Sequence, residues 1–98
     1  MFTVANRTIG RGNKPFIIAE VSANHGGSIQ RAKETILAAK SSGADAVKIQ
    51  TYTPDTMTLE SDKSDFVINE GLWKGYNLYQ LYKEAYTPFE WHKELFEF

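Results

Sequence analysis

Three polar side chains in this 98-residue sequence could share one chemical site: Glu20, Lys48 and Gln50. Glu20 interrupts one apolar run, and Lys48 and Gln50 alternate with apolar residues in a second run. Side chains alternate between the two faces of a β-strand, so the polar residues of each run share a face. A carboxylate can act as an acid or a base, and lysine offers a positive charge to phosphate or carboxylate. The trio predicts a site for an anionic substrate. The alternative is a structural ion pair between Glu20 and Lys48.

The two apolar runs, residues 16–22 and 46–52, are the strands expected to position these side chains. Their length and near-continuous apolar character are typical of parallel strands. Between them, apolar residues at helical spacing follow a capping Ser28 and end before Gly43. The pattern predicts a strand–helix–strand unit of an α/β protein. Active sites of such folds lie at the carboxyl ends of the strands, where the parity argument places the trio.

The turn after the first strand contains two further candidates, Asn24 and His25, followed by two glycines. Backbone N–H groups and the amino terminus of the following helix could hold an anion there. His25 lies in a loop of the kind that forms barrel sites, so we interpret Asn24 and His25 as substrate-binding candidates. The alternative is an ordinary turn that uses glycine for its dihedral angles and Ser28 as a cap.

The rest of the chain offers weaker signals. Residues 2–10 predict a small hairpin, and the polar stretch 53–73 is long enough to be either functional or loosely ordered. Apolar spacing predicts a helix over residues 78–85, capped by Asn77. The run Thr87-Pro88-Phe89-Glu90 predicts a capping box that starts another helix.

Aromatic residues are concentrated near the carboxyl end and could form either a core or a ligand cage. Their spacing matches the buried stripes of the two expected helices, which favours core packing. They are Tyr76, Tyr79, Tyr82, Tyr86, Phe89 and Trp91. Two parallel strands alone leave two open edges, so we expect residues 1–98 to be the amino-terminal part of a larger α/β domain.

Composition excludes several classes of function. The formal charge of −1 provides no basic patch for nucleic acid. There is no apolar run long enough for a membrane span and no signal-peptide pattern, so we expect no membrane partner and a cytoplasmic location. The absence of cysteine excludes thiolate metal sites and a cysteine nucleophile. We assign no metal ligand.

Several motifs together resemble the sialic acid synthase family, from about Lys14 to Phe98. The segments 71–73 and 87–92 are more similar to its pseudaminic acid synthase branch than to its N-acetylneuraminate branch. The motifs that carry the resemblance are Ile17-Ile18-Ala19-Glu20, Ser22-Ala23-Asn24-His25, Gly43-Ala44-Asp45-Ala46-Val47-Lys48-Ile49-Gln50 and Thr51-Tyr52-Thr53-Pro54-Asp55.

The resemblance implies a (βα)8 TIM barrel, of which this chain would form the opening βα units behind an amino-terminal hairpin. It implies condensation of phosphoenolpyruvate with an amino sugar, 2,4-diacetamido-2,4,6-trideoxy-altropyranose, to a nine-carbon 2-keto sugar acid and phosphate. It also implies a divalent metal, Mn or Mg, whose ligands lie outside this chain, and a homodimer of the full-length protein. Glu20 corresponds to the family's catalytic carboxylate near the sugar, and Lys48 and Gln50 to residues that bind the two substrates.

Three other interpretations stay open. The chain could belong to an N-acetylneuraminate synthase that uses N-acetylmannosamine. Lys48 could instead form a Schiff base in an aldolase, since a strand-borne lysine can do that chemistry. The third alternative is a non-catalytic half-barrel used for binding or assembly.

Overall fold

The chain begins with a short hairpin in the computed structural model, which describes residues 1–98. Strand β1 (Phe2–Val4) pairs antiparallel with β2 (Arg7–Ile9). Ala5 and Asn6 form the two-residue turn, and both have positive φ, 48° and 64°. Positive φ at both turn positions gives the backbone twist that matches the flanking strands. The hairpin predicted over residues 2–10 is confirmed.

A strand–helix–strand unit follows, as predicted. Strands β3 (Ile18–Val21) and β4 (Ala46–Ile49) pair in parallel, and helix α1 (Ile29–Ser41) connects them. The Ser28 hydroxyl caps α1 by accepting the Arg31 N–H at 3.2 Å. Both strands are shorter than the apolar runs, because the ladder stops before each run does.

The polar stretch after β4 contains ordered structure. Helix α2 (Pro54–Met57) is capped by Thr53, whose N–H donates to the Thr56 hydroxyl at 3.1 Å. The 3₁₀ helix η2 (Ser64–Phe66) lies further along, and Val67 then forms an antiparallel bridge with Asn77. Local hydrogen bonds therefore organise a segment that composition alone marked only as long and polar.

Two helices end the chain. Helix α3 (Leu78–Ala85) has a reciprocal cap, in which the Asn77 Oδ1 accepts the Gln80 N–H at 2.8 Å and the Gln80 Oε1 accepts the Asn77 N–H at 3.1 Å. The next helix begins as the 3₁₀ helix η3 (Phe89–Trp91) and continues as α4 (His92–Glu97).

The predicted capping box at residues 87–90 is wrong. Pro88 occupies the cap position of η3, and no side chain caps that helix. The Thr87 hydroxyl turns inward and bonds to a buried histidine ring instead. A tertiary partner has therefore displaced the local hydrogen bond that the sequence favours.

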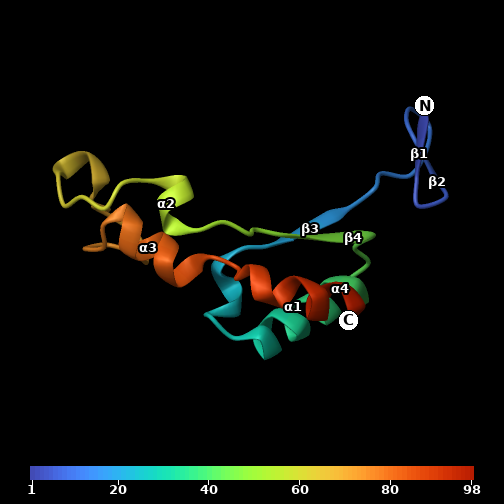
Figure 1. Ribbon diagram of the computed structural model, residues 1–98. Helices are drawn as coiled ribbons and strands as arrows, with labels where there is room; N and C mark the ends of the chain where they lie inside the picture. Colours follow the sequence, from blue (N-terminus) through green and yellow to red (C-terminus); the bar gives the residue numbers. More distant parts are fainter.

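Helices α1 and α4 lie on one side of the two parallel strands. Figure 1 shows β3 and β4 side by side, α1 and α4 together against one face, and the hairpin beyond the far end of the strands. Helices α2 and α3 lie past the carboxyl ends of the strands (Figure 1). Lys33 of α1 forms an ion pair with Glu94 of α4 at 2.6 Å. No element covers the opposite face of β3 and β4.

The core is small, with seven of the 98 residues buried. Its apolar members are Val21, Ala32, Ala85 and Leu95. Tyr52, after β4, meets the Tyr82 ring of α3 edge to face at 5.5 Å and lies near the Tyr86 ring at 6.4 Å. None of the six aromatic residues expected in the core is fully buried, and Phe89 is 60% exposed, so the core interpretation does not hold for Phe89. No helix has the length and apolar character required to span a membrane.

Candidate active site

The structure brings Glu20, Lys48 and Gln50 together. Glu20 and Lys48 are direct partners in the parallel ladder, and Gln50 follows the last paired residue of β4. The Lys48 Nζ lies 3.5 Å from the Glu20 Oε2, and the Gln50 Nε2 donates to the same oxygen at 3.1 Å. Three side chains predicted from strand parity therefore form one cluster.

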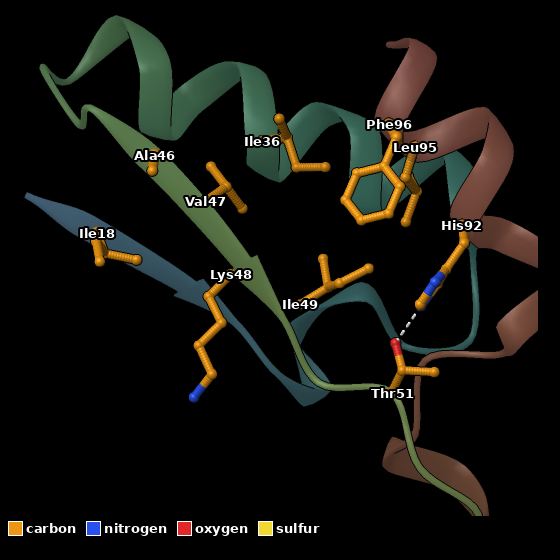
Figure 2. A pocket seen from close by; sticks show the side chains of 10 residues that line it. All are labelled: Ile18, Ile36, Ala46, Val47, Lys48, Ile49, Thr51, His92, Leu95 and Phe96. Atoms are coloured by element: carbon orange, nitrogen blue, oxygen red, sulfur yellow. Dashed lines mark hydrogen bonds between the residues drawn. The ribbon is translucent and has the colours of Figure 1, made fainter. Parts of the chain in front are cut away.

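The cluster lies on the sheet face that the helices leave open. Figure 2 shows Val47 and Ile49 pointing towards Ile36 and Phe96, while the Lys48 side chain extends away from them. Alternation along β4 separates an apolar face, packed on helices, from a polar face that carries the site. The predicted parity of β4 is confirmed.

The ion pair between Glu20 and Lys48 is exposed to solvent. The Glu20 and Lys48 side chains are 53% and 59% exposed, because nothing in residues 1–98 lies over them. Exposed pairs of this kind contribute about 0–1 kcal/mol to stability. The presence of this ion pair is therefore poorly explained by a contribution to the stability of the fold. The Glu20 Oε1 and the Gln50 side-chain carbonyl make no hydrogen bond within the chain, so both can receive donors from a ligand.

A separate hollow lies mainly on the helix-covered side of β4, and Lys48 and Ile18 also border it. It is a groove of about 670 Å³ between β4, α1 and α4, lined mainly by apolar side chains. Near its end, the Thr51 hydroxyl and the His92 Nε2 lie 2.5 Å apart (Figure 2). Apolar side chains such as Val47, Leu95 and Phe96 suit packing against protein better than binding a charged substrate.

Asn24 lies just past the carboxyl end of β3, in the 3₁₀ helix η1 (Ala23–His25). It is exposed, and its Oδ1 accepts the Ser22 N–H at 2.9 Å. In the turn suggested as an anion site, the glycine N–H groups are already occupied. The N–H groups of Gly26, Gly27 and Ser28 all donate to acceptors within the turn.

His25 is buried, unlike the accessible loop histidine that the sequence suggested. It is 1% exposed, its Nδ1 accepts the Gly27 N–H at 2.9 Å, and its Nε2 lies 3.2 Å from the Thr87 hydroxyl. Burial penalises the charged ring and lowers the pKa of His25 below its ordinary value. Direct contact between His25 and a substrate would require this arrangement to open.

The residues of this chain do not fit a metal ion. No three side chains of the His, Asp or Glu type lie close enough together to hold one. The carboxylate of the cluster, Glu20, already has a cation beside it in Lys48.

Comparison with known proteins identifies the family of this chain. The sequence profile of the NeuB family matches residues 35–98, more than half of the chain, including Lys48 and Gln50. The chain belongs to the NeuB family.

Two relatives of the chain are synthases of sugar acids. The chain is 62% identical over 84 residues to a pseudaminic acid synthase of Campylobacter jejuni, which covers 86% of this chain and 24% of that protein. It is 51% identical over 55 residues to the N,N'-diacetyllegionaminic acid synthase of Legionella pneumophila, covering 55% of this chain and 15% of that protein.

A solved structure has the same arrangement of elements. The crystal structure of the spore coat polysaccharide biosynthesis protein SpsE from Bacillus subtilis matches 98% of this chain with a TM-score of 0.63 and 32% identity. The match covers 24% of the SpsE chain. This NeuB-family chain thus spans about a quarter of the length of the Campylobacter and Bacillus relatives, and it is a mixed α/β segment.

Two long-range polar contacts, His25–Thr87 and Thr51–His92, had no signal in the sequence. Thr87 was interpreted as a helix cap, and the contact between Thr51 and His92 was not foreseen. Both contacts join positions more than 40 residues apart. Local patterns carry no signal for such pairs.

Proposed function

We propose that this chain forms the opening strands of the (βα)8 barrel of a sugar acid synthase. The reaction joins phosphoenolpyruvate to an N-acylated amino sugar and yields a nine-carbon 2-keto sugar acid plus phosphate. The observation that carries the proposal is the Glu20–Lys48–Gln50 cluster, which lies on the open face of the parallel strands. In a closed barrel, that face would line the interior near the end where barrel sites form.

The three side chains have distinct roles in this proposal. Lys48 supplies a positive charge to the carboxylate or phosphate of phosphoenolpyruvate. Glu20 contacts the sugar and serves as the acid or base for a hydroxyl or water proton. Gln50 bonds to Glu20 at 3.1 Å and fixes its direction, while its side-chain carbonyl can accept a hydrogen bond from a substrate.

The bonds that form and break in the reaction define the charges and protons that these residues must handle. The methylene carbon of phosphoenolpyruvate attacks the aldehyde carbon of the sugar, whose oxygen takes up a proton and becomes a hydroxyl. Water adds to the pyruvyl carbon, and phosphate then leaves by cleavage of the C–O bond. Lys48 is suited to the anionic phosphoenolpyruvate, and Glu20 to the proton movements.

The substrate assignment rests on the relatives. The match to a pseudaminic acid synthase is both longer and more identical than the match to the legionaminic acid synthase. We therefore propose 2,4-diacetamido-2,4,6-trideoxy-altropyranose as the sugar. Asn24, exposed beside the strand end, is a second candidate for a substrate contact. A divalent metal, if the complete synthase uses one, must be held by residues outside this chain, and the homodimer is likewise part of the proposal.

The test is phosphate release by a full-length protein that carries this sequence. It is incubated with phosphoenolpyruvate, Mn²⁺ or Mg²⁺, and each of several acetamido and diacetamido sugars. We expect phosphate release that depends on the diacetamido sugar, and loss of release in Glu20→Gln. Release only with N-acetylmannosamine would contradict the choice of sugar. The absence of release with every sugar would contradict the synthase and favour a binding or assembly role.

A further inference from the structure

Two buried polar side chains lie behind the proposed site, His25 and Thr87. Each is 1% exposed, and together with Val21 they are the largest fully buried side chains of the chain. The His25 Nε2 and the Thr87 Oγ1 are 3.2 Å apart and join positions 62 residues apart in sequence. A buried polar pair in so small a core calls for an explanation beyond apolar packing.

The hydrogen bonds of the His25 ring determine its tautomer. The Gly27 N–H donates to Nδ1 at 2.9 Å, so Nδ1 is an acceptor. In a neutral ring the proton then lies on Nε2, which donates to the Thr87 hydroxyl. The Trp91 ring packs edge to face on the imidazole at 5.0 Å. Three contacts therefore fix both the position and the orientation of His25.

Thr87 connects this pair to the site through the main chain. Its N–H donates to the Gln50 carbonyl at 3.1 Å. The β3–β4 ladder ends at the pair Val21 and Ile49, so Gln50 has no strand partner to hold it. The Gln50 side chain in turn donates to Glu20. A series of hydrogen bonds, joined through the covalent bonds of Thr87 and Gln50, thus runs from the turn after β3, through the α3–α4 junction, to the proposed catalytic carboxylate.

We propose that His25 and Thr87 are positioning residues of the synthase site. Their hydrogen bond fixes the α3–α4 junction against the turn after β3, and Thr87 thereby holds Gln50 and, through it, Glu20. This inference rests on the proposed function, and it gives His25 a role without contact with substrate. Displacement of a reacting group by about 1 Å can reduce a rate about 100-fold. A small shift of Glu20 on loss of the His25–Thr87 hydrogen bond would therefore slow the reaction.

Thr87→Val tests the pair in a full-length protein that carries this sequence. Valine keeps the shape and the main-chain N–H but removes the hydroxyl. We expect kcat to fall about 10- to 100-fold, with the KM for phosphoenolpyruvate changed less than about threefold, because the β3–β4 ladder holds Lys48 independently of Thr87. Thr87→Ser keeps the hydroxyl and should retain kcat within about threefold of the unmodified protein.

A matched control is Thr35→Val in α1. The Thr35 hydroxyl donates to the Arg31 carbonyl at 2.8 Å, within one helix, so its removal tests loss of a hydroxyl away from the site. We expect unchanged kinetics. An equal loss in Thr87→Val and Thr87→Ser, or wild-type kinetics in Thr87→Val, would overturn the positioning role. Should Thr87→Val not fold, Thr87→Ser decides: a tenfold or greater loss of kcat overturns the role.

A spectroscopic measurement checks the geometry independently of activity. Nitrogen-15 NMR of labelled histidine, assigned with a His25→Gln variant, should show the Nε2–H tautomer for His25. An Nδ1–H tautomer would overturn the arrangement. An unmodified protein that releases no phosphate contradicts the proposed function itself, whereas an active protein with a silent Thr87→Val change contradicts only this inference.

Discussion

Lys48 is the residue on which the proposed anion binding depends. Its side chain is more than half exposed and its ammonium has one carboxylate partner, so a substrate anion can join it without breaking a buried network. Interactions that involve a charged hydrogen bond contribute about 1.5–3 kcal/mol. The charge of Lys48 is therefore worth more to a bound anion inside a closed barrel than to the exposed ion pair seen here.

Lys48→Ala should raise the KM for phosphoenolpyruvate about 10- to 100-fold in a full-length protein that carries this sequence. Steady-state phosphate release measures the change. Lys40→Ala, in the last turn of α1, is the matched control, because it removes an exposed lysine on another element. Unchanged kinetics in Lys48→Ala would remove the anion-binding role. Trapping of the protein by borohydride with a keto substrate would favour the Schiff-base alternative.

His25 should make the protein less stable on acidification. Its pKa is lowered by burial, so in the pH range from its folded pKa up to about 6.5 the unfolded chain binds more protons than the folded one. Stability therefore falls as the pH drops through that range. We expect a urea midpoint that decreases below pH 6.5, and a smaller decrease in His25→Gln. Equal pH dependence in both proteins would contradict the buried neutral ring.

At this scale, strand alternation was enough to predict the cluster. Glu20 and Lys48 lie on strands of two-residue period and Gln50 directly follows one of them, so the side on which each points follows from position alone. His25 could not be placed in the same way. Its environment depends on Thr87 and Trp91, which approach only after the whole chain has folded back.

Helix α1 depends on its amino-terminal cap. The Ser28 hydroxyl is the side-chain acceptor for the exposed N–H of Arg31. Ser28→Ala should lower the free energy of unfolding by about 1 kcal/mol, because that N–H loses its partner. Denaturant titration measures the loss. Ser41→Ala, at the exposed carboxyl end of the same helix, should change the free energy much less, and equal effects would argue against the capping role.

The hairpin is attached to the strand pair through Arg7 and Asp45. The Arg7 guanidinium forms an ion pair with Asp45, whose other oxygen accepts the Ile17 N–H at 2.9 Å. That backbone hydrogen bond, with the charge of Arg7, lowers the pKa of Asp45. Asp45→Asn should increase hydrogen exchange in residues 2–9, with Asp65→Asn as an exposed control. Protection that stays unchanged in Asp45→Asn would show that the attachment lies elsewhere.

Elements with local signals were predictable. Caps at Ser28 and Asn77 and the turn at residues 5–6 use hydrogen bonds or dihedral angles encoded within a few residues. The helix cap predicted at Thr87 is not formed, although its sequence signal was as strong as those at Ser28 and Asn77. A distant buried acceptor or donor can outcompete a local one, and one-dimensional patterns do not report it.

The molecule as a whole is open rather than compact. Its radius of gyration is 16.8 Å, whereas a compact chain of this length has about 13 Å. Large apolar side chains remain exposed on the strands and on α4, among them Ile18 at 56% and Phe96 at 76%. The strand pair also has an unpaired edge on each side. These surfaces match what further strands and helices of an α/β domain would cover.

Residues 1–98 produced alone should therefore self-associate. Apolar surface and free strand edges favour pairing with other copies. Sedimentation velocity over a range of concentrations measures the effect, and Phe96→Lys should reduce it. A monomer at all concentrations, with the well-dispersed NMR spectrum of a packed core, would contradict the inference that this segment needs more protein around it.

The series of contacts behind Gln50 has a consequence for the order of folding during synthesis on the ribosome. Glu20, Lys48 and Gln50 belong to a single strand–helix–strand unit, so they can assemble soon after that unit emerges. Thr87 arrives later, and only then can the histidine ring find its partner. A nascent polypeptide can thus align its reactive groups first and become rigid afterwards.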